Sequence, residues 1–235
     1  MRPMLAFDTS TPCARVAVLS PEGDCLAAAE KVAARHSSNL LRLCDEVFRA
    51  TGATVKDLAA IACGAGPGSF TGLRVGLAVA KGLALADRIP FVLVSSLDAL
   101  AVDLTGTNDE GLVLPCIDAG KGQVYGRLYR AAGGTSAPIG SDELALLPED
   151  LCRLVREQAA GAALVAGGNG VDRYQEVFRA QLGVEAVRFQ VAGPSALAVG
   201  RLALARLARG EHDNLETSVP RYGRPPDITK PKAAP

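Results

Sequence analysis

The stretch CGAGPGSFTGLRVGLAVAKGLAL, residues 63–85, decides the fold of this chain. It joins a short buried strand, predicted over Ala59–Cys63, to a long helix predicted over Thr71–Ala86. Four glycines fall within the nine residues 64–72 at this junction. Such a loop lets the backbone approach an anion at a helix N-terminus, or lets two segments of one chain touch. It is neither a P-loop nor a dinucleotide fingerprint, because no Gly-Lys-Ser/Thr ends it, and both interpretations stay open.

The helix after this loop is apolar on nearly every side. Its only charged residues between positions 71 and 86 are Arg74 and Lys81. A helix of that kind is buried in its own domain or covered by a partner. A second helix, predicted over residues 38–50, is amphipathic and offers another apolar face. We expect both helices to contribute to a partner interface made of Leu40, Leu43, Val47, Gly72, Leu73, Gly76, Leu77 and Ala80.

Outward from these helices, strands and helices alternate along the chain, which predicts an α/β fold with a largely parallel core and antiparallel additions. A strand, an aspartate, a turn and a second strand occur in residues 4–19 and again in residues 112–129. We interpret this recurrence as an internal duplication. We expect a first domain over residues 1–104, a smaller second domain over 105–215, and a proline-rich, disordered tail over 216–235.

An aspartate ends the first strand of each repeat, at Asp8 and at Asp118. A carboxylate in this position can hold a metal–nucleotide complex, but an aspartate after a strand is also a common turn-former. Neither interpretation is excluded by the residues alone. If the glycine loop faces an anion or a nucleotide, the residues around that ligand are Asp8, Thr9, Ser10, Gly66, Gly68, Ser69 and Asp118.

The charge balance limits the kinds of partner. The chain has 25 Lys plus Arg and 25 Asp plus Glu, so its formal net charge is zero. Proteins that bind nucleic acid by themselves usually carry a basic excess, because counterion release supplies most of that affinity. Contact with RNA is therefore expected only through a more basic partner.

No signal peptide is visible, and the longest apolar stretch, Val75–Ala86, is too short and interrupted to span a bilayer, so we expect a cytoplasmic protein without membrane contact.

Cysteine and histidine usage gives no sign of a catalytic or metal site. The six cysteines show no CxxC spacing and are expected to be reduced core residues. His36 and His212 are the only histidines in the chain. A catalytic cysteine needs a basic partner, and a metal needs several ligands close together. We therefore expect no catalytic cysteine and no metal site built from histidines.

Five segments resemble the TsaB (YeaZ) family. They are AFDTSTPCARVAVL, RHSSNLL, the stretch of residues 63–85, IPFVLVSSLDALA and IDAGKGQVYGRLY. The resemblance is strong over residues 4–130, and PGSFTGLRVGLAVAKGLA is its most diagnostic part. It is weaker afterwards, where the glycines of AGGNGV and the ending Pro220-Arg221-Tyr222 fit the family.

The resemblance implies an actin-like (ASKHA) fold, a duplicated α/β domain with mixed sheets whose second half is abbreviated here. It also implies a non-catalytic, activating scaffold subunit of the bacterial complex that forms N6-threonylcarbamoyladenosine next to the anticodon of tRNA. The partners implied are a TsaD-type transferase subunit, in a heterodimer, and a TsaE-type ATPase. Transfer RNA would be contacted only through the complex, and the chain alone could form a homodimer.

One segment separates this chain from the related catalytic family, TsaD. The catalytic relatives resemble V-N-H-L-x-x-H at the place where this chain has V-S-S-L-D-A-L, residues 94–100. Two histidines four residues apart on a helix can bind one metal ion. Here the two positions are Ser96 and Leu100. The comparison with this family therefore implies no catalytic residue, no bound metal, no cofactor and no transfer chemistry in this chain. The alternative is an independent enzyme of the actin-like superfamily, either a small-molecule kinase or a metallopeptidase.

Overall fold

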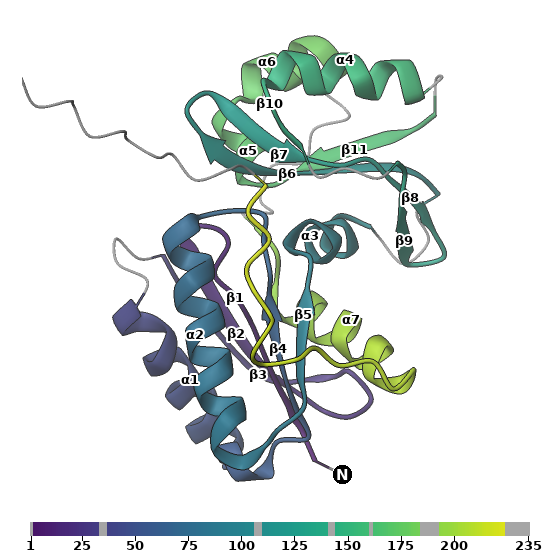
Figure 1. Ribbon diagram of the computed structural model, residues 1–235. Coiled ribbons are helices and arrows are strands. Elements are labelled where there is room, and N and C mark those ends of the chain that lie inside the picture. The colour runs from purple at the N-terminus through teal and green to yellow at the C-terminus, as the bar shows by residue number, and fades with distance from the viewer. Residues whose placement is uncertain are drawn as a thin grey trace, which may run out of the picture.

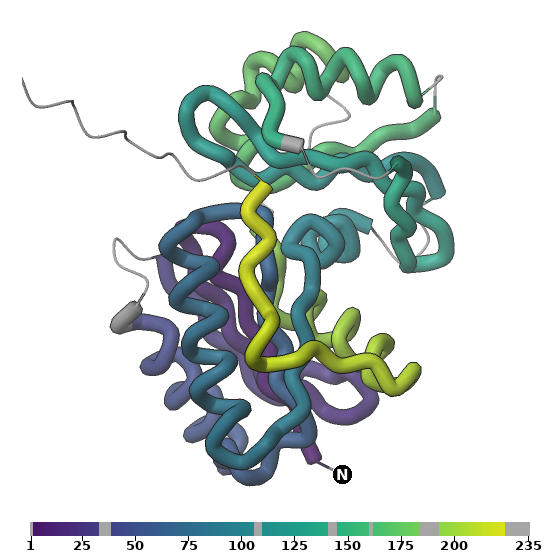
Figure 2. Tube along the Cα trace, in the orientation of Figure 1, coloured from purple at the N-terminus to yellow at the C-terminus, as the bar shows by residue number. Residues whose placement is uncertain are grey.

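The computed structural model describes residues 2–32, 37–105, 110–140, 144–159, 162–183 and 193–223. These residues form two lobes, each built on one β-sheet with helices packed against it (Figure 1). Figure 2 shows that the chain builds most of the first lobe, crosses to the second, and then returns to the first near its C-terminal end. None of the helices in these ranges is long and apolar enough to cross a membrane.

The first lobe contains a five-stranded mixed sheet in the order β3-β2-β1-β4-β5. The central strand β1 pairs antiparallel with β2 and parallel with β4. All residues of β1, β4 and β5 are buried, as expected for strands covered on both faces. The bounds are β1 Met4–Asp8, β2 Cys13–Leu19, β3 Cys25–Val32, β4 Ala60–Gly64 and β5 Phe91–Val94.

Two pairs of helices cover the two faces of this sheet. Side chains alternate along a strand, so Leu5 and Phe7 pack with α1 and α2, whereas Met4 and Ala6 pack with α3 and α7. Ser69 caps α2 by accepting a hydrogen bond from the backbone N–H of Gly72 at 3.2 Å. The bounds are α1 Ser37–Thr51, α2 Phe70–Asp87, α3 Ser96–Leu104 and α7 Ala196–Ala208, with a short 3₁₀ turn at Val55–Asp57.

The second lobe has a sheet in the order β10-β7-β6-β8-β9, with β11 paired to β6. Helices α4 and α6 pack on one face around Phe178, and α3 packs on the other face around Tyr129. Helix α3 therefore lies between the two sheets (Figure 1). The bounds are β6 Gly111–Gly120, β7 Gln123–Gly126, β8 Tyr129–Ala132, β9 Thr135–Pro138, β10 Leu144–Leu146, α4 Pro148–Ala159, β11 Leu164–Gly167, α5 Asn169–Arg173 and α6 Gln175–Leu182.

The two lobes repeat one topology. Strands β1 and β6 each pair antiparallel with the next strand, β2 or β7, and parallel with β4 or β11. Strands β2 and β7 in turn pair antiparallel with β3 or β10. Strands β8 and β9, which extend the second sheet from β6, have no counterpart in the first lobe. One α-helix precedes the parallel strand in each lobe, α1 before β4 and α4 before β11. The second copy is shorter, since β10 and β11 have three and four residues, and no strand follows β11 in the described part of the chain. The expected α/β fold with mixed sheets and an abbreviated second half is confirmed.

Helix α7 belongs with the first sheet, although the expected second domain of residues 105–215 contained it. Its buried residues, among them Val199 and Ala203, pack against β1, β2 and β5. Gly200 permits this contact, because a Cβ there would lie 2.5 Å from a methyl carbon of Leu19. The second half of the chain therefore returns to cover a face that the first half leaves apolar.

Residues 211–223 run across the first lobe, and we call this segment the C-terminal strap. The backbone N–H of Asp213 donates to the carbonyl oxygen of Phe91 at 2.8 Å, and that of Arg221 donates to the carbonyl oxygen of Ala65 at 2.7 Å. The yellow segment in Figures 1 and 2 shows this path between α2 and β5. The expectation of a disordered tail is thus wrong for residues 216–223, and residues 224–235 lie outside the described residues.

Two glycines of α2 should respond in opposite ways to alanine. A Cβ on Gly76 would lie 2.3 Å from Oγ1 of Thr9, whereas a Cβ on Gly82 meets nothing within 4 Å. Gly76→Ala should lower the free energy of unfolding by about 1–3 kcal/mol through overpacking. Gly82→Ala should raise it by about 0.5–1 kcal/mol, because alanine favours an exposed helix. Urea unfolding of both variants measures this, and equal effects of the same sign would contradict the packing described for α2.

Candidate functional site

Asp8, at the end of β1, is held by three hydrogen bonds in the interior of the first lobe. Its Oδ1 accepts from the backbone N–H of Ser10 at 2.7 Å and from the Ser10 hydroxyl at 2.6 Å. Its Oδ2 accepts from the hydroxyl of Ser96 at 2.7 Å. The residue is only 1% exposed. A carboxylate offers about four acceptor positions, so its own chain satisfies most of them.

Burial is the main influence on the charge of this carboxyl group. Desolvation raises the pKa of Asp8 above its ordinary value of 3.8, while the hydrogen bonds from Ser10 and Ser96 and the charge of Arg15 lower it. The folded state therefore holds this proton to a higher pH than the unfolded chain does. The three donors are the local compensation for keeping an acid in this place.

The glycines of the loop are needed for contact within the chain. A Cβ on Gly64 would lie 1.9 Å from Oδ2 of Asp8, and one on Gly68 would lie 2.3 Å from the carbonyl oxygen of Ser10. A Cβ on Gly72 would lie 2.1 Å from the carbonyl oxygen of Thr9. The backbone N–H of Ser69 also donates to the carbonyl oxygen of Ser10 at 2.7 Å. Of the two interpretations left open by the sequence, this geometry favours the tight turn.

Ser96 and Leu100, at the positions of the histidine pair in the catalytic relatives, are both part of the core. Ser96 is 0% exposed, and besides donating to Asp8 it accepts from the backbone N–H of Gly66 at 3.2 Å. Leu100 is 0% exposed and packs in the layer between the lobes. Within the described ranges, no three His, Cys, Asp or Glu side chains are grouped so that they could hold a metal ion.

Asp118 is placed in the second lobe, at the position equivalent to Asp8. Its Oδ2 accepts from the guanidinium of Arg173 at 2.7 Å, and its Oδ1 accepts from the backbone N–H of Gly120 at 3.0 Å. Its own backbone N–H donates to the side chain of Asn169 at 3.1 Å. The structure thus joins Asp8, Thr9, Ser10, Gly66, Gly68 and Ser69 in one set of contacts, whereas these three hydrogen bonds of Asp118 stay within its own lobe.

The eight residues expected at a partner interface lie inside the first lobe. Leu40, Leu43, Val47, Leu73 and Ala80 are each at most 1% exposed, and all of them except Leu73 belong to the core cluster between the sheet and α1 and α2. Leu77 is 8% exposed, and Gly72 and Gly76 contact residue Thr9 of the same chain. The expected residues are therefore wrong as an exposed surface, because the sheet needs the apolar face that they supply.

The opposite side of α2 carries a different row of small residues. Ala78, Gly82 and Ala86 are exposed and spaced four residues apart, so they form a ridge along the helix. Leu85 beside them is 71% exposed. We call these four residues the α2 ridge. The sequence pattern contained this row, but only the structure shows which of the two small-residue rows faces outward.

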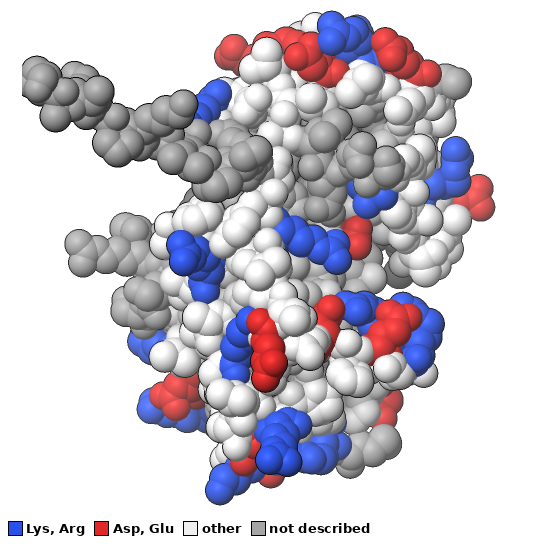
Figure 3. Space-filling view, in the orientation of Figure 1, with Lys and Arg blue, Asp and Glu red and all other residues white. Residues whose placement is uncertain are grey.

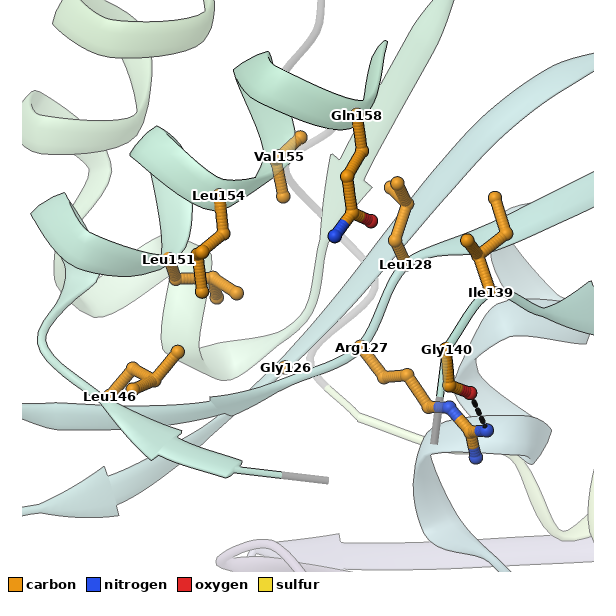
Figure 4. Close-up of a pocket in the computed structure, with 10 residues that line it drawn as sticks. All are labelled: Gly126, Arg127, Leu128, Ile139, Gly140, Leu146, Leu151, Leu154, Val155 and Gln158. Carbon is orange, nitrogen blue, oxygen red and sulfur yellow. Dashed lines mark hydrogen bonds between the residues drawn. The ribbon is translucent and has the colours of Figure 1, made fainter. Parts of the chain in front are cut away.

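One hollow lies beside the α2 ridge, where Gly82 and Ala86 face Thr54 and Lys56. Another hollow of about 170 Å³ lies in the second lobe between α4 and the segment joining β7 to β8 (Figure 4). Its walls are mainly aliphatic, with Leu146, Leu151 and Leu154 on one side, and Arg127 turns its guanidinium toward the carbonyl oxygen of Gly140 at the rim. It is not part of the Asp8 contacts and shows no cluster of acidic or basic groups suited to catalysis.

Comparison with known proteins gives consistent results. The family model described as "TsaD: tRNA N6-adenosine threonylcarbamoyltransferase" matches residues 28–192. The tRNA threonylcarbamoyladenosine biosynthesis protein TsaB of Escherichia coli is 36% identical over 127 residues, which are 54% of this chain and 54% of that protein. The Bacillus subtilis protein of the same description is 32% identical over 146 residues, 62% and 63% of the two chains. The matches thus span about half to two thirds of these relatives' length.

Solved structures agree with this. A Pseudomonas aeruginosa protein described as similar to the peptidase YeaZ has a TM-score of 0.82 and 33% identity, covering 95% of this chain and all of the other. YeaZ from Pseudomonas aeruginosa has a TM-score of 0.76 and 31% identity, covering 94% and 100%. A dehydratase activator from Clostridium difficile solved with bound ADPNP, 12% identical at a TM-score of 0.54 over 90% and 98% of the two chains, shares the fold alone. The expected actin-like fold is confirmed.

Removing the Ser96 hydroxyl should cost stability in a pH-dependent way. Ser96→Ala deprives Asp8 of a donor and leaves the N–H of Gly66 without its acceptor, so a loss of about 1.5–3 kcal/mol is expected at pH 8. Because the pKa of Asp8 is raised in the fold, lowering the pH toward 4 protonates the group and should reduce the loss. Denaturant unfolding at several pH values measures this.

A suitable control is Ser20→Ala. The Ser20 hydroxyl accepts from the backbone N–H groups of Glu22 and Asp24 in an exposed turn. Its effect should not change between pH 4 and pH 8. An effect of Ser96→Ala that is equally flat with pH would show that Asp8 does not carry a charge in this network.

Proposed function

We propose that this chain, which belongs to the TsaB (YeaZ) family, is a non-catalytic partner subunit in the formation of N6-threonylcarbamoyladenosine on tRNA. The family membership rests on the matched family model and on the YeaZ structures that the chain covers completely. The descriptions of the relatives name the modified nucleoside.

The observation that carries the proposal is the α2 ridge. Ala78, Gly82 and Ala86 leave the helix backbone nearly uncovered over two turns, and a Cβ on Gly82 would meet nothing within 4 Å. Small residues in such a row let a second helix approach closely. The strongly exposed Leu85 adds an aliphatic anchor at the same place. Exposed apolar surface of this kind favours a protein partner.

The interior of the first lobe supports a role without chemistry of its own. A catalytic carboxylate has to reach its substrate, whereas Asp8 is buried and bound by Ser10 and Ser96. The two positions that hold histidines in the TsaD family are filled by Ser96 and Leu100 in the core. The residues that could act on a substrate are instead used to hold the lobes together.

The partner that fits this proposal is a TsaD-type transferase, with a TsaE-type ATPase joining the assembly. A subunit that has lost the histidine pair can still share the fold and the helix surfaces of the subunit that keeps it. A second copy of this chain could occupy the same ridge in the absence of the transferase. The zero net charge of the chain supports a tRNA contact that depends mainly on the assembled complex.

The ridge can be tested with Gly82→Arg. The side chain would extend into open space in the isolated protein, and arginine is a better helix former than glycine, so the fold should be unharmed. In a complex the same side chain would separate two closely packed helices. Affinity for the TsaD-type subunit of the same organism should fall by at least ~2 kcal/mol, as for other central interface positions. Isothermal titration calorimetry measures this.

The matched control is Gln158→Arg, which places the same charge on an exposed position of α4 in the second lobe. It should bind the transferase subunit as the unchanged chain does. Size-exclusion chromatography of each chain alone shows whether a homodimer uses the ridge as well. If Gly82→Arg is folded and binds with unchanged affinity, the ridge is not the interface.

A further inference from the structure

A small aromatic and cationic cluster lies at the N-terminal end of α2, away from the α2 ridge. The rings of Phe70 and Tyr222 pack against each other in a tilted arrangement, with their centroids 4.8 Å apart and an angle of 31° between their planes. The guanidinium of Arg74 lies over the Phe70 ring, 5.2 Å from its centroid. Phe70 is the first residue of α2, and Tyr222 belongs to the C-terminal strap, so two distant parts of the chain build this cluster.

These aromatic side chains are unusually exposed. Phe70 is 48% exposed and Tyr222 is 39% exposed, whereas Phe7, Phe91, Phe178 and Tyr129 are buried at 1% or less. A pair of rings that served only to fasten the strap would gain more from being covered by the core. Part of each ring therefore remains available to a further flat group.

The cluster also carries positive charge that no carboxylate in the described part of the chain neutralises. Arg74 and Arg221, the residue before Tyr222, are both exposed. Among the residues that the structure describes, neither of these two arginines makes an ion pair with a carboxylate. Figure 3 shows this face of the molecule, where basic and acidic side chains are scattered with uncharged surface between them. The unpaired guanidiniums favour an anionic ligand.

The cluster is fixed by the backbone beneath it. Arg221 is anchored by its N–H bond to Ala65 of the glycine loop, and α2 begins at Phe70 behind the Ser69 cap. A Cβ on Gly223 would lie 2.6 Å from the Tyr125 ring of the second lobe, so the strap is confined on that side too. Preorganised rings and cations bind a ligand with little further loss of conformational freedom.

The two ends of α2 differ in chemistry. The α2 ridge is aliphatic and suits a helix, whereas the end at Phe70 offers flat π surfaces and guanidinium groups. With about 1.5 Å of rise per residue, Phe70 and Leu85 lie roughly 22 Å apart along the axis. Aromatic platforms flanked by arginine are the usual means of holding an unstacked base and its phosphates.

We propose that Phe70 and Tyr222 form a stacking site for an unpaired base of single-stranded RNA, and that Arg74 and Arg221 contact the adjoining phosphates. The choice of RNA over single-stranded DNA rests on the proposed function, while the stacking and the charge rest on the contacts above. The chain has no net positive charge, so the site binds weakly by itself and adds one contact to a larger complex.

The absence of tryptophan from the chain gives a direct test. Tyr222→Trp places a single indole in the site, and a base stacking on it should quench its fluorescence. The probe is an unstructured RNA of about 12 nucleotides rich in adenosine, a length within the usual range of single-strand sites. An RNA duplex of the same length serves as comparison, both at low salt. Saturable quenching by the single strand is expected, with weaker quenching by the duplex.

Two further variants in the Tyr222→Trp background assign the contacts. Phe70→Ala should weaken RNA binding by about 5- to 100-fold, the range expected for losing one stacking partner. Arg221→Ala should reduce the slope of log affinity against log salt by about 0.7, the value for one phosphate of a single strand. Circular dichroism melts show that each variant is folded.

The control is Leu147→Trp, an indole at a position 48% exposed in the second lobe, which RNA should not quench in a saturable way. The inference is overturned if RNA quenches both indoles alike or neither of them. It is also overturned if the emission of the indole introduced by Tyr222→Trp responds only to the TsaD-type subunit, because the cluster is then a protein contact. None of these outcomes alters the test of the α2 ridge, so the two proposals fail independently.

Discussion

The hydrogen bond between Ser96 and Asp8 is the interaction on which the rest of the structure depends. It links the end of β1 to the first residue of α3, at 2.7 Å and out of reach of solvent. Helix α3 in turn supports the second lobe, where its residues pack with Ile117 and Tyr129 and where Asp98 accepts the Tyr129 hydroxyl at 2.7 Å. Burying a carboxylate is costly without such donors, so the position of α3 and the bonding of Asp8 require each other.

The same constraint explains the composition of the glycine loop. Because Asp8, Thr9 and Ser10 fill the space beneath it, Gly64, Gly68 and Gly72 have no room for a side chain. The loop then passes under the C-terminal strap at Ala65. The glycines of this loop, which resemble those of a phosphate-binding loop, serve here to let it pack closely on the segment Asp8–Ser10. The surfaces left for recognition are those outside it, the α2 ridge and the aromatic cluster at Phe70.

Much of the fold could be predicted from the sequence, because short stretches of it show the residue patterns typical of strands, helices and turns. The strands of the first lobe and α2 follow from apolar runs and from the glycine junction, and the duplication follows from the aspartate-turn repeat. The partner surface could not be predicted in the same way. Helix α2 carries two rows of small residues, and periodicity alone does not say whether Gly72–Gly76–Ala80 or Ala78–Gly82–Ala86 faces the sheet. The glycine contacts with Thr9 decide this.

The path of the C-terminal strap could not be predicted from sequence patterns either. It depends on contacts such as the hydrogen bond that the Leu93 N–H donates to the Asp213 carboxylate at 2.7 Å. Such a contact joins residues more than 100 positions apart and leaves no local signal in the sequence.

The central claim is that the Asp8 network is closed, so that this chain acts through its surfaces. Titration of Mg²⁺-ATP into the isolated protein, followed by calorimetry, tests this most directly, because the strand-terminal carboxylate and the glycine loop are the features that could hold a metal–nucleotide complex. The account predicts no binding up to millimolar ATP. Binding in the micromolar range would contradict it, since Asp8 or the glycine loop would then have to open to a ligand.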